Sequence, residues 1–255
     1  MEKALIEVRN LITHYGDFRV LDGVSFDVRP GEIFMIIGGS GCGKSTLLKH
    51  MCGLLKPTSG EIRFNGRNIA DLDEEALSVM QHAIGIAFQS SGLFNSMTVG
   101  ENIAMPMREF GEVDPELIDH LVRFKLSLVG LSNAQYQMPG ELSGGMRKRA
   151  GLARALALDP ELVYFDEPSA GLDPIMAAGL DELILKMKGL LKTTFIIVTH
   201  ELESIRLVAD RILMLDMGRV VFCGTLDEAA ACEIPRLRQF FDRQPDEFIS
   251  QRNLD

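Results

Sequence analysis

Residues 38–45 read GGSGCGKS and fit the phosphate-binding pattern GxxxxGK[ST]. A short apolar run, IFMII at 33–37, precedes them and is typical of a buried strand. A helix is predicted to follow, with one apolar face made of Leu47, Leu48, Met51 and Leu55. A strand, a glycine-rich loop and a helix in this order indicate a nucleotide site. The alternative is a glycine-rich turn that matches the pattern by chance, and the flanking elements disfavour it.

The residue types of this loop explain how it would hold phosphate. Glycines let successive backbone N–H groups turn inward around phosphate oxygens, and a helix N-terminus adds the positive end of its dipole. Lys44 can neutralise charge on the β- and γ-phosphates, and the Ser45 hydroxyl can ligate Mg²⁺. The nucleotide contacts predicted in this loop are Gly38, Gly39, Ser40, Gly41, Cys42, Gly43, Lys44, Ser45 and Thr46.

A second stretch, LVYFDE at 162–167, places two acids at the end of an apolar run. Asp166 would lie at a strand tip beside the phosphate loop and help to hold Mg²⁺, and Glu167 could polarise an attacking water as general base. His200, in FIIVTHE at 195–201, could contact the γ-phosphate if its strand neighbours the catalytic one. The alternatives are a solvated turn for the two acids and a structural role for the histidine.

Strand-like apolar runs alternate with helical patterns along the chain, which predicts an α/β fold with a mostly parallel sheet covered by helices. The clearest buried strands are 33–37, 162–165 and 195–198. Polar or glycine-rich residues follow each of them. Ligands of parallel sheets bind beyond the carboxyl ends of the strands, so we expect the candidate residues to meet at one edge.

Two regions depart from this alternation. The segments 6–8 and 24–28 suggest antiparallel strands, and 62–64 followed by Asn65-Gly66 fits a hairpin. From about 95 to 157 the pattern is mainly helical, which predicts a helical subdomain inserted into the sheet domain. A further amphipathic helix is predicted from Asp173-Pro174, an N-cap acid followed by proline in the first turn.

The composition excludes several classes of protein. The net charge of −10 argues against nucleic-acid binding, because phosphate backbones are held by a surplus of Lys and Arg. The four cysteines form no CxxC pair and are expected to be reduced thiols. The start, MEKALIEVRN, is too polar for a signal peptide, and no apolar run approaches the ~20 residues that span a bilayer. A function at a membrane would therefore require a partner there.

The stretch LSGGM at 142–146 indicates the class of the protein. A helix is predicted from about Met146 to Ala157, and its N-terminus offers a second phosphate site. One chain cannot easily bring both sites to the same nucleotide. With this stretch, the sequence resembles the ATP-binding-cassette (ABC) ATPases. The resemblance implies that two cassettes pair head to tail, so that Ser143, Gly144 and Gly145 contact the ATP held by the other subunit.

The remaining family motifs follow in order, and the resemblance covers residues 4–226. It implies that Tyr15 stacks on adenine, with Phe18 as the less favoured alternative. It implies that Gln89, in AFQS, reaches Mg²⁺ and the attacking water, and that His200 is the switch histidine. SAGLD at 169–173 matches the loop that meets its twin across the dimer. No core motif departs from the family pattern, so an active ATPase that uses ATP and Mg²⁺ is expected.

Three kinds of ABC protein share these motifs. A DNA-repair type needs a long coiled-coil insertion, and a ribosome-acting type usually carries two cassettes, so an ATPase subunit of a membrane transporter fits best. FQSSGLFNSMTVGENIAMPM at 88–107 and residues 141–175 resemble the Mce-type lipid transporters, the group of the maintenance-of-lipid-asymmetry (Mla) system. The tail-like PRLRQFF at 235–241 does so too. An importer of polar amino acids or another small solute is the alternative.

The resemblance also implies partners and a location. These partners are a second copy of the chain, a pair of membrane permeases, an MCE-domain substrate-binding protein and a STAS-domain protein. The location is the cytoplasmic side of a bacterial inner membrane. Residues 1–241 are interpreted as a single ABC domain and 242–255 as a polar tail. Two possibilities stay open for the C-terminal region: it packs on its own domain and ends in a loose tail, or it crosses to the partner cassette.

Overall fold

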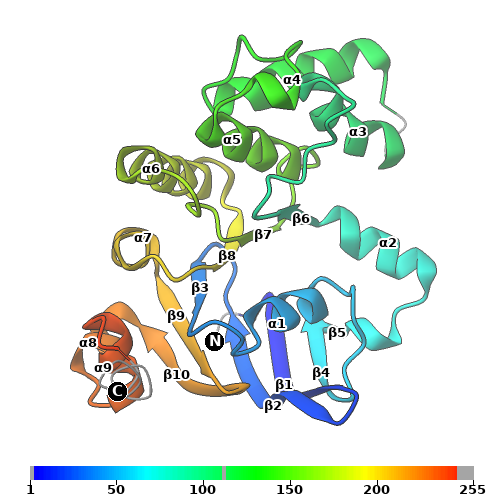
Figure 1. Cartoon of the computed structure of the whole chain (residues 1–255). Helices are drawn as coiled ribbons and strands as arrows, with labels where there is room; N and C mark the ends of the chain where they lie inside the picture. Colours follow the sequence, from blue (N-terminus) through cyan, green and yellow to red (C-terminus); the bar gives the residue numbers. More distant parts are fainter. Residues whose placement is uncertain (1–2, 111–112, 246–255) are drawn as a thin grey trace.

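The computed structural model describes residues 3–110 and 113–245. Two sheets form the framework (Figure 1). The larger has the order β10 (Arg219–Thr225), β9 (Arg211–Asp216), β3 (Ile33–Ile37), β8 (Thr194–Val198), β7 (Leu162–Asp166) and β6 (Ile84–Ala87). The smaller has the order β2 (Phe18–Val28), β1 (Ile6–Tyr15), β4 (Ser59–Phe64) and β5 (Arg67–Asn68).

Strands β9, β3, β8, β7 and β6 run parallel, and β10 is antiparallel to β9. All five residues of β3 are buried, as expected for a central strand covered on both faces. Successive side chains of a strand point to opposite faces, so Phe34 and Ile36 join one core cluster, while Ile33, Met35 and Ile37 join another.

The first core cluster lies between the two sheets and also takes in α1 (Lys44–Met51). Phe26 of β2 stacks on Phe34 of β3 there, with ring centroids 5.5 Å apart. The second cluster lies on the opposite face, under α6 (Pro174–Leu191), α7 (Leu202–Val208), α8 (Leu226–Ala231) and α9 (Pro235–Phe241). The sheet is thus a middle layer, and the edge where its parallel strands end is free to carry a site.

A third core cluster belongs to α3 (Val99–Phe110), α4 (Pro115–Leu128) and α5 (Gly144–Ala155). These helices gather at the top of Figure 1, between the end of β6 and the start of β7. The short η2 (Pro139–Glu141) leads into α5, while η1 (Ile69–Asp71) and α2 (Glu74–His82) connect β5 to β6. The mainly helical stretch expected from about 95 to 157 is where these helices lie. The fold confirms the predicted class: a mostly parallel core, an antiparallel sheet and inserted helices.

Several expected boundaries differ from the observed ones. Strand β1 extends to Tyr15, well beyond the predicted end at Val8, because the polar pair after Val8 marks a bulge rather than a strand end. Asn10 has a φ of 47° at this point, and the register with β2 shifts between Val8 and Leu11. Helix α1 ends at Met51, so Leu55 lies outside it. Helix α5 begins at Gly144, two residues earlier than predicted.

The C-terminal helix α9 packs on its own chain. Leu237 is fully buried, and Phe240 and Phe241 pack against the cluster under α6 and α7. For this helix the structure therefore favours the first of the two possibilities, packing on its own domain. Most of the predicted tail, residues 246–255, lies outside the described residues.

Candidate nucleotide site

The glycine-rich loop has a conformation that needs its glycines. Gly38 has a φ of 143°, and a Cβ there would overlap the carbonyl oxygen of Leu215. Gly43 caps α1 with a φ of 108°, and its Cβ would come 2.7 Å from Leu21 Cδ2. The Leu47 N–H donates to Gly43 O at 2.8 Å, so the N–H groups that precede it open toward the loop. The loop and the start of α1 therefore form an anion cradle.

The residues of the loop differ in how far they are exposed to solvent. Lys44 Nζ donates to the carbonyl oxygens of Gly38 at 2.8 Å and Gly39 at 2.9 Å, so the ammonium lies across the cradle. Ser40, Gly41 and Ser45 are exposed, and Thr46 is half-buried in the first turn of α1. Cys42 is buried, and burial raises the pKa of its thiol, so it acts here as a packed neutral side chain.

The two acids lie at the carboxyl end of β7. Asp166 is paired with Val198 of β8, and the Glu167 N–H donates to Val198 O at 2.8 Å. His200, just beyond β8, places Nδ1 2.9 Å from Glu167 Oε1. The strand of His200 therefore neighbours the catalytic strand, which is the condition that its expected contact with the γ-phosphate requires. Glu167 is mostly buried, and its second oxygen, Oε2, has no hydrogen-bond partner among the described residues.

The electrostatic surroundings of the Asp166 carboxyl group favour a cation beside it. Burial raises the pKa of this carboxyl group, and the charge of Glu167 raises it further, while Lys44, Lys148 and Lys49 oppose the shift. A divalent cation would relieve this concentration of negative charge. The oxygens of Asp166, Ser45 and Gln89 are the hard donors that Mg²⁺ prefers. Within the described residues, no three His, Cys, Asp or Glu side chains cluster as a metal site.

Gln89 and the LSGG segment meet at one cavity of about 300 Å³. Ser143 caps α5, with its Oγ accepting from the Met146 N–H at 3.3 Å, and both Ser143 and Gly144 are exposed while Gly145 is buried. The cavity is lined by Gln89, Ser90, Ser91, Gly144, Arg147, Lys148, Ala170, Gly171 and Leu172. No residue of the loop 38–46 lines it. Within one chain, the LSGG segment thus lies with Gln89 and the SAGLD loop rather than over the phosphate cradle.

The aromatic candidates lie at the turn between β1 and β2. Tyr15 is paired with Phe18 across this turn, and their exposed fractions are 52% and 71%. Further along β2, Leu21 packs against Gly43 of the loop. The turn therefore presents two accessible rings on the strand pair that touches the cradle, and the geometry leaves both as candidates for stacking on a base.

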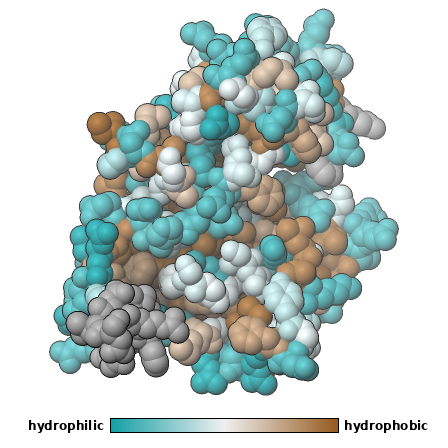
Figure 2. Space-filling view, in the orientation of Figure 1, coloured by the Kyte–Doolittle hydropathy of each residue, from teal (hydrophilic) through white to brown (hydrophobic). Residues whose placement is uncertain are grey.

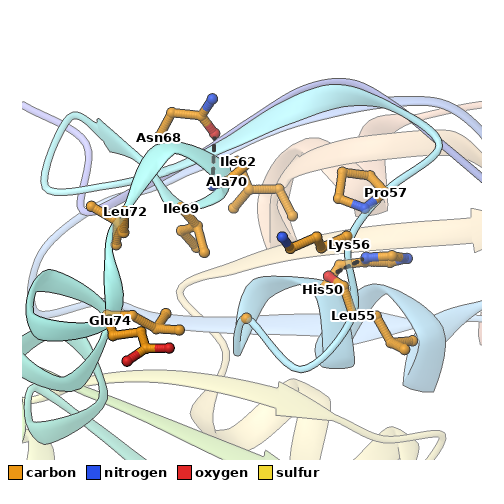
Figure 3. Close-up of a pocket in the computed structure, with 12 residues that line it drawn as sticks. His50, Leu55, Lys56, Pro57, Ile62, Asn68, Ile69, Ala70, Leu72 and Glu74 are labelled. Carbon is orange, nitrogen blue, oxygen red and sulfur yellow. Dashed lines mark hydrogen bonds between the residues drawn. The ribbon is translucent and has the colours of Figure 1, made fainter.

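A separate cavity of about 220 Å³ lies between α1, the β4–β5 hairpin and α2 (Figure 3). Buried His50 lines it, and its ring nitrogens lie 2.8 Å from Thr13 Oγ1 and 2.9 Å from Leu55 O. Burial lowers the pKa of His50, which favours the neutral ring. With both nitrogens satisfied, His50 is a structural residue. Hydrophobic groups also gather at the surface on the side of α1 and α2 (Figure 2).

The matching family model is that of the ABC transporters, and it covers residues 21–170. The chain belongs to the ABC transporter ATP-binding family. The cassette hydrolyses ATP as the ATPase subunit of an ABC transporter. In the part of the chain that the structure describes, no helix has the length and apolar character needed to cross a bilayer.

Two groups of relatives match nearly the whole of this chain. The intermembrane phospholipid transport ATP-binding protein MlaF of Haemophilus influenzae is 40% identical, over 96% of this chain and 93% of that protein. The MlaF of Escherichia coli K12 is 39% identical, over 93% and 88%. The probable ribonucleotide transport ATP-binding protein mkl of Mycobacterium leprae is 40% identical, over 93% of this chain and 68% of that protein.

Solved structures agree with the fold of the cassette. CbiO1 of Clostridium perfringens, part of the ABC transporter complex CbiONQ, has a TM-score of 0.83 at 31% identity, covering 96% of this chain and 97% of that one. The dimeric bacterial ABC transporter cassette MJ0796 has a TM-score of 0.79 at 30% identity, covering 87% and 98%. A dimeric post-hydrolysis state of MJ0796 is bound to ADP and Pi.

One residue of the site was not among the sequence candidates. Lys148, in the second turn of α5, donates to Gln89 O at 2.5 Å and to Glu167 O at 3.0 Å. The sequence shows it only as the middle of a basic triplet after LSGG. A weak signal was available: Lys148, Gly151 and Arg154 repeat at a spacing of three and therefore share one face of the helix.

Proposed function

We propose that this cassette powers the transport of phospholipid between membranes, as the ATPase subunit of an Mla/Mce-type ABC transporter. The observation that carries the proposal is the 40% identity with MlaF over 96% of this chain and 93% of the relative. The similarity therefore extends beyond the ATP-binding motifs to nearly the whole of the relative's chain. Transport of ribonucleotides is the second candidate, favoured by the equal identity with mkl, of which this chain spans 68%.

In the proposed site, Lys44 and the N–H groups at the start of α1 hold the phosphates of ATP. Ser45, Asp166 and Gln89 would hold Mg²⁺, which when bound neutralises charge on the phosphates. Two observations support this assignment: Ser45 is exposed, and a cation beside Asp166 would relieve the burial and the charge of Glu167 that raise the pKa of this carboxyl group. Tyr15 stacks on the adenine, with Phe18 as the alternative.

Glu167 is proposed as the general base that accepts a proton from the attacking water. His200 bonds to Glu167 Oε1, and this fixes the carboxylate while Oε2 remains available as the acceptor. A carboxylate oxygen that is buried without a partner is costly in a resting protein. Its presence beside Asp166 supports a catalytic role.

We further propose that the working unit is a head-to-tail dimer in which Ser143, Gly144 and Gly145 contact ATP bound to the partner's loop. The lining of the cavity at the LSGG segment supports this arrangement, since the cavity is shared with Gln89 and the SAGLD loop and not with residues 38–46. The partners would be two permeases, an MCE-domain protein and a STAS-domain protein, at the cytoplasmic side of the inner membrane.

Replacing Glu167 by Gln tests the catalytic assignment. The amide keeps the shape of the side chain but cannot take the proton, so kcat is expected to fall by about 10²–10⁴ while ATP affinity is retained. Phosphate release and nucleotide binding are measured on the complete transporter. Glu182→Gln, an exposed position on α6, is the matched control. Wild-type hydrolysis by Glu167→Gln would remove Glu167 from the role of base.

The substrate is tested by purifying the complex from membranes and identifying bound molecules by mass spectrometry. Phospholipid enriched over the bulk membrane, and ATPase activity stimulated by phospholipid, are the expected results. Stimulation by ribonucleotides other than ATP, with no phospholipid enrichment, would favour the second candidate.

A further inference from the structure

Lys148 bridges two segments that are far apart in the sequence. Its side chain is 7% exposed, and its ammonium donates to the backbone oxygens of Gln89 and Glu167. Gln89 lies 59 residues before it and Glu167 lies 19 residues after it. An ammonium has three donors and no acceptor, so it is suited to hold two carbonyl groups at once.

The position of the bridge follows from the sheet register. The pairing between β6 and β7 ends at Ala87 and Phe165. Gln89 and Glu167 each lie two residues beyond that pair. The backbone ladder no longer joins the two segments there, and Lys148 supplies the connection across the gap.

Helix α5 holds the Gln89 segment at two further points on the same face. A Cβ at Gly151 would come 2.6 Å from Ser91 O, so the helix and the segment are in direct backbone contact. Arg154 donates to Gly92 O. Gly151 and Arg154 therefore fix this segment on the helix, and Lys148 adds a polar bridge from the same face to the end of the catalytic strand.

Glu167 depends on such support because its backbone is strained. It has a φ of 46°, in the left-handed region that side chains other than glycine rarely adopt. Its N–H donates to Val198 O, its carbonyl oxygen accepts from Lys148 Nζ at 3.0 Å and from the Ala170 N–H at 3.2 Å, and its carboxylate is bonded to His200. Without the ammonium, the carbonyl group keeps only the bond within its own turn and loses its tie to α5, so the strained peptide can shift and move the carboxylate.

We propose that Lys148 is a positioning residue for ATP hydrolysis, which holds the backbone of Glu167 and Gln89 at a fixed separation from inside α5. This inference rests on Glu167 acting as the base. Lys148 reaches the reaction only through the groups that it orients, so its loss slows the chemical step and leaves ATP binding intact.

The test compares Lys148→Met and Lys148→Arg in the complete transporter, with Lys186→Met at an exposed position of α6 as the control for a lost lysine charge. Displacement of a catalytic group by about 1 Å costs on the order of 10²-fold, so Lys148→Met is expected to lower kcat by about 10- to 100-fold. KM for ATP stays within about twofold, since the loop residues that hold ATP are untouched. Lys148→Arg recovers much of kcat because a guanidinium can also donate to two carbonyl groups.

Thermal unfolding measured alongside separates positioning from general stability. If Lys148→Met does not fold, Lys148→Gln replaces it, because its shorter side chain keeps polar donors but does not span both carbonyl groups. A lowered kcat with unchanged KM is again expected. A wild-type kcat in the folded Met or Gln variant, or a raised KM with unchanged kcat, would overturn the proposal.

A double variant distinguishes failure of this proposal from failure of the base assignment. In single-turnover measurements, Lys148→Met should slow Glu167→Gln much less than it slows the wild type, because the group that it positions is already disabled. An equal slowing in both backgrounds would show that Lys148 acts elsewhere. Wild-type turnover by Glu167→Gln would instead refute the base assignment itself.

Discussion

Asp166 carries a charge that its surroundings disfavour. Burial and the neighbouring Glu167 raise the pKa of this group above its ordinary value in the folded protein. A carboxyl group with a raised folded-state pKa favours folding while it is protonated. That contribution is lost as the pH rises through the folded pKa, so at neutral pH without a cation the ionised group lowers the stability.

Asp166→Asn is therefore expected to stabilise the protein and to abolish its Mg²⁺-dependent activity. In Mg²⁺-free buffer at pH 7.5, Tm should rise by about 1–2 °C, a small effect because the carboxylate keeps part of its solvation. The difference should disappear below about pH 3, where the wild-type group is protonated in both the folded and the unfolded states. Differential scanning fluorimetry across this pH range is the measurement. A variant less stable than the wild type at pH 7.5 would contradict the assignment of strain to this charge.

At the scale of residues, contiguous motifs were the predictable part of the site. The loop 38–46 carries its geometry locally, because its glycines and the following helix determine the cradle. The role expected for His200 required its strand to neighbour the catalytic strand, and β7 and β8 are neighbours. For Lys148 the sequence carries only the weak signal of its spacing from Gly151 and Arg154, because its two acceptors are backbone groups, which carry no residue-type signal.

Helix α5 packs closely on the segment after β6, and the two backbones are in contact at Gly151. Gly151→Ala places a methyl group against Ser91 O at 2.6 Å, and both partners are backbone, so neither can move alone. Overpacking of this kind costs about 1–3 kcal/mol in the free energy of unfolding. We expect a lower Tm and a lower ATPase rate, because the displaced segment includes Gln89.

Gly189→Ala in α6 is the control for this prediction. A Cβ at Gly189 would meet nothing within 4 Å, and alanine favours a helix over glycine, so a gain of about 0.5–1 kcal/mol is expected. Chemical denaturation of both variants gives the comparison. Equal stabilisation by the two alanines would mean that α5 does not pack closely on this segment.

At the scale of elements, the type of each element was more predictable than its ends. The predicted bounds of the strand 33–37 agree with the observed bounds, because the strand is apolar throughout and lies between Glu32 and the glycine-rich loop. The predicted strand ends at Val8, whereas β1 continues to Tyr15. The reason is that Arg9 and Asn10 interrupt the alternation of apolar and polar side chains at a bulge. The bulge is held by the pairing of β1 with β2 and β4, and the local sequence does not show this pairing.

A head-to-tail dimer makes a prediction about the whole assembly. Chains carrying Ser143→Arg are paired with chains carrying Lys44→Ala, and the mixed dimer is purified through two different tags. One composite site then has both lesions and the other has none, so measurable ATPase activity is expected although each variant alone is inactive.

The control places both substitutions in one chain and pairs it with wild-type chains. In a head-to-tail dimer each composite site then carries one lesion, and activity should be lost. If the LSGG segment served the ATP of its own chain, the two mixtures would give the reverse result. The comparison thus distinguishes the two arrangements in dimers of the same composition.

The central position of β3 bears on how the chain is made. This fully apolar strand is completed at residue 37, but both of its neighbours come from the last quarter of the chain, β8 from Thr194 and β9 from Arg211. Ribosomes add about 5–20 residues per second, so roughly 160 further residues keep the strand unpaired for about 8–30 s. An unpaired apolar strand is a site for aggregation over that time. The nascent polypeptide is therefore expected to depend on chaperones until β8 has emerged, and ribosome-bound chains that stop before residue 194 should be the form that chaperones retain.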